Sequence, residues 1–398
     1  MGTQAKDVNL LYAGQLDPGF GVFGQIRPDF LAGSVRAVVL SAEGSLTYAT
    51  RQGEGFTLYR TDSDGIKDEA FGHDGNTGEW RFVCGKQATP VRLLLQDDRK
   101  ILVIGETQEA DGIRRAALRR FHANGSPDLV FGSVVIPVAQ HDYSQVELID
   151  GCLQDDGKVL VSFTYYISDS QGALLARLYG NGELDTGFGN GGFLEIESEG
   201  DFIQLSSVVI QDGKIVVGGT TLSGQLVLAR YDLQGRIDSQ FGVDGLAFYA
   251  STDGSLRMRQ LIPQADGKLV CAGGLQETLG MVMRFTADGR PDKEWNGGRP
   301  VLTDTGPETF WRALAQQPDG EIVVVGHNRA LHILAGRLLP NGKPDARFGR
   351  TGTGWISFGP SGGVAWDVKV QSAARMIVGA EAVIDIGHHG PVVYGLQA

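Results

Sequence analysis

The chain alternates between short apolar runs and glycine-containing polar turns along its whole length. Runs such as Ser207–Gln211 and Lys214–Val217 are rich in β-branched residues, and the pair Asp212–Gly213 separates them. Asp-Gly and Asn-Gly pairs supply the positive φ values that tight β-hairpins need, and short β-branched runs between such turns are typical of strands. No window of about 12 residues shows the periodicity of an amphipathic helix. The pattern therefore predicts an all-β protein.

One turn motif, Asp-x-x-Phe-Gly, recurs through the sequence. Its aromatic residue occurs seven times at intervals of 51 to 60 residues, and tryptophan replaces phenylalanine once. The copies are Asp17–Gly21, Asp68–Gly72, Asp128–Gly132, Asp185–Gly189, Asp238–Gly242, Asp345–Gly349 and the degenerate Asp292–Asn296. Each unit supplies four strands, and four strands about every 55 residues is the size of a propeller blade. A closed ring of blades buries the two end faces that an open stack would expose.

The repeats predict a seven-bladed β-propeller with four antiparallel strands per blade, formed by a single domain over residues 1–398. The strand that ends at a recurring glutamine should be the innermost strand of its blade. The strand after Phe-Gly then becomes the outermost strand of the preceding blade. The blades should span 33–86, 87–140, 141–198, 199–251, 252–305, 308–359 and 360–398, and segment 17–28 should complete the last one. This N-terminal strand leaves no unpaired sheet edge.

The repeated segments resemble a known family. Leu184–Gly192 carries the sequence Leu-Asp-Thr-Gly-Phe-Gly-Asn-Gly-Gly, and Gln211–Gly219 carries Gln-Asp-Gly-Lys-Ile-Val-Val-Gly-Gly downstream of it. Together they are similar to the bacterial delta-60 repeat family, a set of β-propeller-like repeats of uncharacterised function. The resemblance extends over nearly the whole chain. It implies the fold and no particular chemistry.

The composition is that of an ordinary globular protein, with 42% hydrophobic residues, 21% charged residues and a formal net charge of −12. This charge argues against nucleic acid or an anionic membrane as the main partner, since both recruit clustered lysine and arginine. Neither a signal peptide nor an apolar run of the ~18 residues that span a membrane is evident. We expect a soluble, cytoplasmic monomer without membrane insertion, although signal-independent export would leave the same sequence.

The sequence offers no metal or cofactor site of recognisable spacing. Cys84, Cys152 and Cys271 form no Cys-x-x-Cys pair and are expected to be buried free thiols. In the repeated motif we expect the aspartate to bond local backbone amides and the aromatic ring to fill a blade interface. Calcium needs several oxygens at fixed offsets, and only Asp62 and Asp64 leave that alternative open. We predict no catalytic residue, no metal and no cofactor.

One set of polar residues is a candidate ligand site. Aligned on the recurring glutamine, or on Ser41 in the first unit, the innermost strands carry mixed polar residues four to six positions earlier. These residues should ring one mouth of the central channel, and concave sites of this kind bind ligands. The predicted binding residues are Arg36, Arg92, Asp150, Arg259, Trp311, Arg312, Trp366 and Asp367. The arginines favour an acidic or carboxylate-bearing ligand, unless the two aspartates neutralise them.

Three functions are compatible with these features. The first is a non-enzymatic binding module that displays its loops and channel mouth to a protein or carbohydrate partner. It is favoured because the repeats are regular and no catalytic motif occurs. The second is a hydrolase or lyase that acts on a sugar or lactone at the channel mouth, with residues gathered from different blades. The third is a lectin, which would need recurring tryptophan or tyrosine, and the five tryptophans do not recur in that way.

Overall fold

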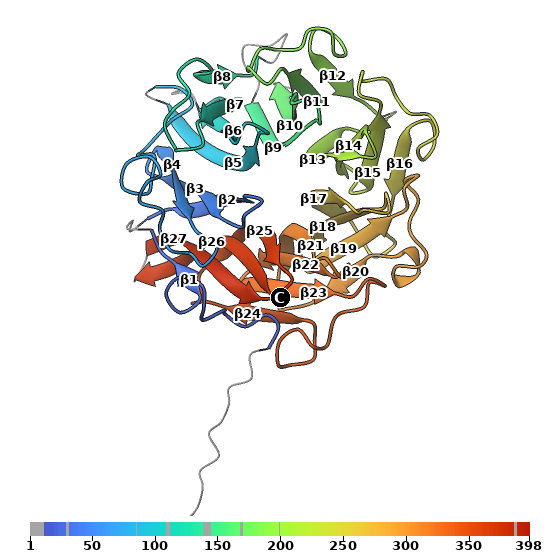
Figure 1. Cartoon of the computed structure of the whole chain (residues 1–398). Helices are drawn as coiled ribbons and strands as arrows, with labels where there is room; N and C mark the ends of the chain where they lie inside the picture. Colours follow the sequence, from blue (N-terminus) through green and yellow to red (C-terminus); the bar gives the residue numbers. More distant parts are fainter. Residues whose placement is uncertain are drawn as a thin grey trace, which may run out of the picture.

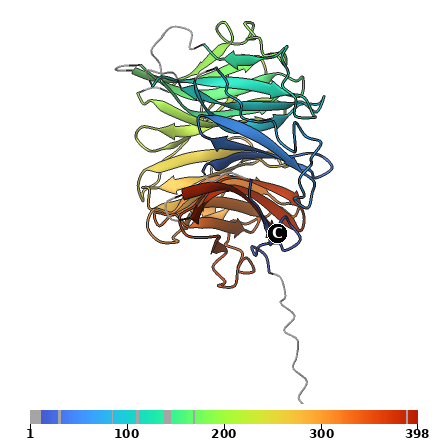
Figure 2. The same ribbon diagram turned by 90° about the vertical axis from the view of Figure 1, so that its left-hand side faces the viewer.

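The computed structural model describes residues 12–28, 32–84, 86–108, 112–137, 145–167, 170–198, 200–385 and 388–398. These residues form seven antiparallel sheets arranged in a ring (Figure 1). In the side view the sheets make a single layer around that ring (Figure 2). The predicted seven-bladed β-propeller is confirmed. Within the described ranges, no helix is long and apolar enough to cross a membrane.

Each blade is an antiparallel meander that begins at the centre of the ring and runs outwards. The innermost strands are β2 (Ser34–Leu40), β5 (Gln87–Leu95), β9 (Gln145–Leu153), β13 (Ile203–Gln211), β17 (Leu256–Pro263), β21 (Phe310–Gln316) and β25 (Val364–Ser372). The second strands are β3 (Leu46–Gln52), β6 (Ile101–Gln108), β10 (Val159–Ile167), β14 (Lys214–Thr221), β18 (Leu269–Leu275), β22 (Ile322–His327) and β26 (Arg375–Asp385). The third strands are β4 (Gly55–Thr61), β7 (Arg114–Phe121), β11 (Ser170–Leu178), β15 (Leu226–Tyr231), β19 (Leu279–Phe285), β23 (Ile333–Leu338) and β27 (His388–Gln397).

The outermost strands follow the Phe-Gly turns, as the sequence predicts. In blades 2 to 7 they are β8 (Ser133–Val135), β12 (Phe193–Ile196), β16 (Leu246–Tyr249), β20 (Val301–Thr303), β24 (Trp355–Phe358) and β1 (Gln25–Ile26). In blade 1 single bridges, Tyr59 to Asn76 and Phe56 to Trp80, take the place of a fourth strand. A three-residue 3-10 helix, η1 (Asn296–Gly298), begins at the last residue of the degenerate motif.

The N-terminal segment closes the ring. Strand β1 pairs with β27, with Gln25 opposite Tyr394, so the two ends of the described chain share one blade (Figure 1). The backbone N–H of Asp17 also donates to the Gly395 carbonyl at 2.8 Å, and Phe20 is fully buried beside them. The predicted closure of the last blade is confirmed.

The apolar core is divided into seven clusters, one at each interface between neighbouring blades. Every cluster contains one aromatic residue of the repeated motif, and these residues are Phe20, Phe71, Phe131, Phe188, Phe241, Trp295 and Phe348. A turn glycine of the next unit covers the ring. At Gly125, φ is +82° and a Cβ would lie 2.8 Å from the Gly72 nitrogen, so only glycine fits there. The motif aromatics therefore fill the blade interfaces, as expected.

Each motif aspartate pairs with a largely buried arginine, and we call this pair a latch. The pairs are Arg60–Asp68, Arg120–Asp128, Arg177–Asp185, Arg230–Asp238, Arg284–Asp292, Arg337–Asp345 and Arg375–Asp17, with Nε to Oδ2 distances of 2.5 to 2.9 Å. Each guanidinium carbon also lies 4.3 to 5.5 Å from the centroid of the motif ring. The other aspartate oxygen accepts a nearby backbone N–H, as at Gly187.

The latch also connects neighbouring blades. Arg284 Nη1, for example, donates to the carbonyl of Pro340 in the following blade at 2.8 Å, and Arg230 Nη1 donates to Ala287 in the same way at 2.6 Å. The recurring aspartates are thus occupied by structural contacts. The arginine is the part of this repeat that sequence reasoning missed.

Candidate functional site

All seven innermost strands contain a β-bulge at the same level of the ring. In each, the pairing register with the second strand shifts by one residue. The extra residues are Arg36, Val91, Ser206, Arg259, Arg312 and Trp366, and in β9 the shift falls at Leu148 and Ile149. Six of these positions, and Ile149 in β9, lie five residues before the recurring glutamine or Ser41. Bulges of this kind redirect a side chain away from the regular alternation of a strand.

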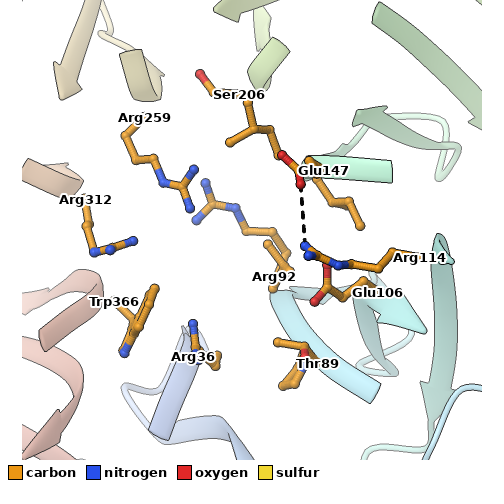
Figure 3. A pocket seen from close by; sticks show the side chains of 14 residues that line it. Arg36, Thr89, Arg92, Glu106, Arg114, Glu147, Ser206, Arg259, Arg312 and Trp366 are labelled. Atoms are coloured by element: carbon orange, nitrogen blue, oxygen red, sulfur yellow. Dashed lines mark ion pairs between the residues drawn. The ribbon is translucent and has the colours of Figure 1, made fainter. Parts of the chain in front are cut away.

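The bulged residues together form the wall of a cavity of about 360 Å³ at one mouth of the channel (Figure 3). The cavity is lined by Arg36, Thr89, Pro90, Val91, Arg92, Glu106, Arg114, Glu147, Leu148, Ile149, Ser206, Arg259, Arg312 and Trp366. Its volume lies in the range of small-molecule sites. All seven blades contribute to it, so the complete ring is needed to build the cavity.

Trp366 lies between two arginines on one side of this cavity (Figure 3). The guanidinium carbon of Arg36 is 3.5 Å from the centroid of the Trp366 ring, and that of Arg312 is 4.2 Å from it. Arg36 Nε donates to Ser34 Oγ at 2.6 Å, and Arg312 Nε lies 3.3 Å from His327 Nδ1. Cation–π contacts of this kind hold a guanidinium in place and leave the edges of its N–H fork available.

Arg259 and Arg92 point toward the middle of the cavity from different blades (Figure 3). Arg92 forms an ion pair with the buried Asp150 and lies 3.9 Å from Asp367. Burial opposes the charge of Arg92, but Asp150 and Asp367 raise its pKa above the usual value. Arg259 differs, because it forms no ion pair with a carboxylate in the described part of the chain, although the charges of Asp150 and Glu147 favour its cation.

Three guanidinium groups therefore share the cavity without an ion pair to a carboxylate of the described residues, namely those of Arg36, Arg259 and Arg312. Burial is the largest cause that lowers the pKa of Arg36 to about 10, against the opposing charge of Glu381. Burial and then the charges of Arg259 and Arg36 lower the pKa of Arg312 to about 9. Burial and the neighbouring Arg92 likewise lower the pKa of Arg259. The fold thus holds three cations where their charge is disfavoured.

The opposite wall of the cavity carries two glutamates and one arginine. Arg114 Nη1 lies 3.7 Å from Glu147 Oε1 (Figure 3). Burial raises the pKa of Glu106, although Arg114 opposes the shift. This wall comes from the second and third strands of blade 2 and from β9 of blade 3. This wall carries one more formal negative than positive charge, and the excess positive charge lies on the side of Arg36, Arg259 and Arg312.

Five of the eight predicted binding residues line this cavity: Arg36, Arg92, Arg259, Arg312 and Trp366. The other three, Asp150, Trp311 and Asp367, are each at most 3% exposed and lie outside its wall. Their expected place at the mouth is corrected, because their side chains are buried and do not line the cavity. Arg92, one residue after the bulge at Val91, shows that such a position can also line the cavity.

The residues directly after the bulges join neighbouring blades. Asp150 Oδ2 accepts the Val208 N–H at 3.1 Å, and Asp367 Oδ2 accepts the Val38 N–H at 3.0 Å. Ser207 and Gln260 accept backbone N–H groups of the next innermost strands in the same way, at 3.2 and 2.8 Å. Buried acceptors of this kind hold the innermost strands in register. They thereby fix the strands that carry the cavity arginines.

Other candidate positions make local contacts or lie apart from the cavity. In the part of the chain that the structure describes, no group of three or more His, Cys, Asp or Glu side chains could hold a metal ion. Asp62 Oδ1 accepts the N–H groups of Asp64 and Ile66 at 2.9 and 2.8 Å, and Asp64 pairs with Arg375 at 3.0 Å. Cys84 is exposed, so the expectation of a buried thiol is wrong there.

Comparison with known proteins supports the architecture. A family model described as a β-propeller domain of unknown function (DUF5122) matches residues 96–131, 154–188 and 210–241. Each matched segment begins at or next to a recurring glutamine and ends at a motif aromatic. No curated protein matches the chain.

Two solved structures are similar in fold. A streptogramin B lyase has a TM-score of 0.55 and 10% identity, with 94% of this chain and 97% of that chain covered. A catalytically inactive virginiamycin B lyase from Staphylococcus aureus with quinupristin has a TM-score of 0.52 and 8% identity, with 94% and 98% covered. At such identity the likeness extends to the fold alone.

Proposed function

We propose that this chain is a non-enzymatic binding module that holds an acidic ligand at the channel mouth. The proposal is supported by a contrast between two sets of arginines. Seven arginines are paired with aspartates in the latches. Arg36, Arg259 and Arg312 face one cavity, and none of them has a carboxylate partner among the residues described. A carboxylate or phosphate of a ligand supplies that partner, since a guanidinium binds either group through two parallel hydrogen bonds.

The scaffold also favours binding. Arg36, Arg259 and Arg312 each sit on a bulge of an innermost strand, and the acceptors next to the bulges fix these strands against one another. A site that is already ordered before the ligand arrives loses little entropy on binding. The ligand is an acidic small molecule, or an acidic group carried by a protein or a glycan, and the module binds it as a monomer.

The two alternative functions have weaker support. A lectin stacks a sugar on an aromatic face, but Trp366 already lies between two guanidinium groups. A hydrolase or lyase would need a proton donor or acceptor at the cavity. Glu106 is the residue that favours this second candidate, because a carboxyl with a raised pKa is suited to acid catalysis. The adjacent Arg114 opposes the shift and weakens the case.

A thermal-shift screen of organic acids, phosphates, neutral sugars and lactones tests the proposal. We expect acids or phosphates to stabilise the protein and neutral sugars to leave its melting temperature unchanged. Arg312→Gln should abolish the stabilisation, whereas Arg257→Gln should retain it. Arg257 is the matched control, because it lies on the same face of the ring and is 64% exposed and paired with Glu277. Stabilisation only by neutral sugars would contradict the proposal, and product formation detected by NMR would favour the enzyme.

A further inference from the structure

We infer that the ligand of this cavity is a compact, non-aromatic oligoanion, a small molecule that carries two or more carboxylate or phosphate groups. This inference rests on the proposed function and specifies its ligand class. It is drawn from the number, the spacing and the stacking of the cavity side chains.

The charge of the cavity exceeds what one anionic group can balance. Arg92 is compensated by Asp150, and Arg114 faces Glu147 and Glu106 on the far wall. The guanidinium groups that form no ion pair with a described carboxylate belong to Arg36, Arg259 and Arg312, and burial outweighs the nearby carboxylates in lowering the pKa of each. A ligand with one carboxylate would leave two of these cations without a partner. A ligand with two or three anionic groups pairs with the whole set.

The spacing of the arginines suits several anionic groups on one small molecule. The guanidinium carbons of Arg36 and Arg312 lie 3.5 and 4.2 Å from the centroid of the same ring, so they are at most about 8 Å apart. Arg259 approaches the same cavity from blade 5 (Figure 3). Each guanidinium offers a planar fork that matches one carboxylate or phosphate. Anionic groups on neighbouring atoms of one molecule can therefore contact more than one of these forks.

The stacking of Trp366 excludes ligands that need an aromatic surface. Its ring is held between Arg36 and Arg312, and among the described residues that line the cavity it is the only aromatic side chain. A flat aromatic acid or a sugar ring thus finds no ring face to stack on. The cavity volume of about 360 Å³ also favours a small molecule over a polymer segment.

Isothermal titration calorimetry tests the inference with a series of acids that share the same carbon chain and differ in their number of carboxylates. Butyrate, glutarate and propane-1,2,3-tricarboxylate carry one, two and three carboxylates, and pyrophosphate and inorganic phosphate form a second series. We expect affinity to rise at least tenfold with each added carboxylate and pyrophosphate to bind more tightly than phosphate. Benzoate should bind no better than butyrate, because no aromatic face is free.

Variants locate the binding. Arg259→Gln and Arg312→Gln should each bind the tricarboxylate about as weakly as the parent binds glutarate. The control Arg257→Gln should bind the tricarboxylate with the affinity of the parent. Arg312→Lys should also lose affinity, because an ammonium group keeps the charge but not the planar fork. Circular dichroism melting of each variant confirms that it is folded.

Each failure has a distinct meaning. Butyrate that binds as tightly as the tricarboxylate, with both losing affinity in Arg259→Gln, would overturn the oligoanion inference and leave the proposed function intact. Absence of binding by every acid and phosphate would overturn both. Affinity that is unchanged in the Arg259 and Arg312 variants would overturn both as well, since the anion would then bind elsewhere.

Discussion

Replacing Arg177 by methionine removes one latch between blades 3 and 4 and keeps most of the apolar bulk of the side chain. Arg177 Nε lies 2.8 Å from Asp185 Oδ2, and the two side chains are 10% and 4% exposed. The same guanidinium lies 4.3 Å from the centroid of Phe188 and donates to the carbonyl of Leu233 in the next blade. The substitution therefore leaves a buried carboxylate without its cation.

The expected loss of stability is large compared with that caused by a surface substitution. Removal of one partner from a buried ion pair costs about 3 to 5 kcal/mol. The entropy of unfolding is about 2.1 cal/mol/K per residue, which for 398 residues amounts to about 0.8 kcal/mol/K. The melting temperature of Arg177→Met should accordingly fall by about 4 to 6 °C.

Differential scanning calorimetry at pH 7 measures this change, with Arg236→Met as the matched control. Arg236 pairs with Asp232 at 2.7 Å but is 78% exposed, and exposed pairs contribute only about 0 to 1 kcal/mol. The melting temperature of Arg236→Met should fall by about 1 °C or less.

The pH dependence gives an independent check. Burial opposes the shift, but hydrogen bonds from Tyr179 and Arg177 and the charge of Arg177 lower the pKa of Asp185. An aspartate with a lowered pKa contributes stability above about pH 4, and this contribution is lost as the pH falls through the folded pKa. The difference in melting temperature between the parent and Arg177→Met should therefore become smaller below pH ~4. The role given to the latch would be refuted if the melting temperature of Arg177→Met fell no more than that of Arg236→Met. It would also be refuted if the difference from the parent stayed constant as the pH was lowered below ~4.

Three further predictions concern the closure, the cavity and the thiols. Deletion of residues 1–28 removes β1 and the buried Phe20, so the protein should melt at a lower temperature and aggregate in size-exclusion chromatography; an unchanged elution and melting temperature would show that the closure is dispensable. Arg259→Gln should raise the melting temperature of the ligand-free protein by about 1 °C, because burial disfavours the charge at this position. A clearly lower melting temperature in calorimetry would contradict the statement that the charge of Arg259 is disfavoured in the folded protein. Mass spectrometry after alkylation should find the exposed Cys84 modified and Cys271 protected, since burial raises the pKa of Cys271 to about 12; rapid modification of both in the native protein would oppose this reasoning.

The fold could be predicted because each structural requirement of a blade recurs in the sequence. The Phe-Gly turns mark the blade interfaces, and the strand after each turn becomes an outer strand, as at Phe131 and β8. Even the closing strand could be placed, since the last unit lacks an outer strand of its own. The latch arginines recur eight residues before the aspartates in six blades. Their partners became evident only in three dimensions, most clearly for Arg375 and Asp17 at opposite ends of the chain.

The site was predictable in place but not in detail. Alignment on the recurring glutamine located the level of the mouth correctly. Side chains in a regular strand alternate between faces, and the bulges insert an extra residue that breaks this alternation. Asp150 and Asp367, one residue after the bulges, are buried outside the cavity, whereas Arg92 at the same position of its strand lines it. Glu106 and Arg114 lie on second and third strands, so an alignment of innermost strands could not include them.

The central claim is that Arg36, Arg259 and Arg312 form an anion site at the channel mouth. A crystal structure of the protein soaked in selenate tests it most directly, because the anomalous scattering of selenium locates the anion without reference to the protein. The account predicts an anomalous peak inside the cavity, with selenate oxygens within hydrogen-bonding distance of Arg259 and of at least one of the two arginines that contact Trp366. The peak should be absent from crystals of Arg259→Gln prepared in the same way. Selenate bound only at the outer surface, or an equal peak in the variant, would contradict the account.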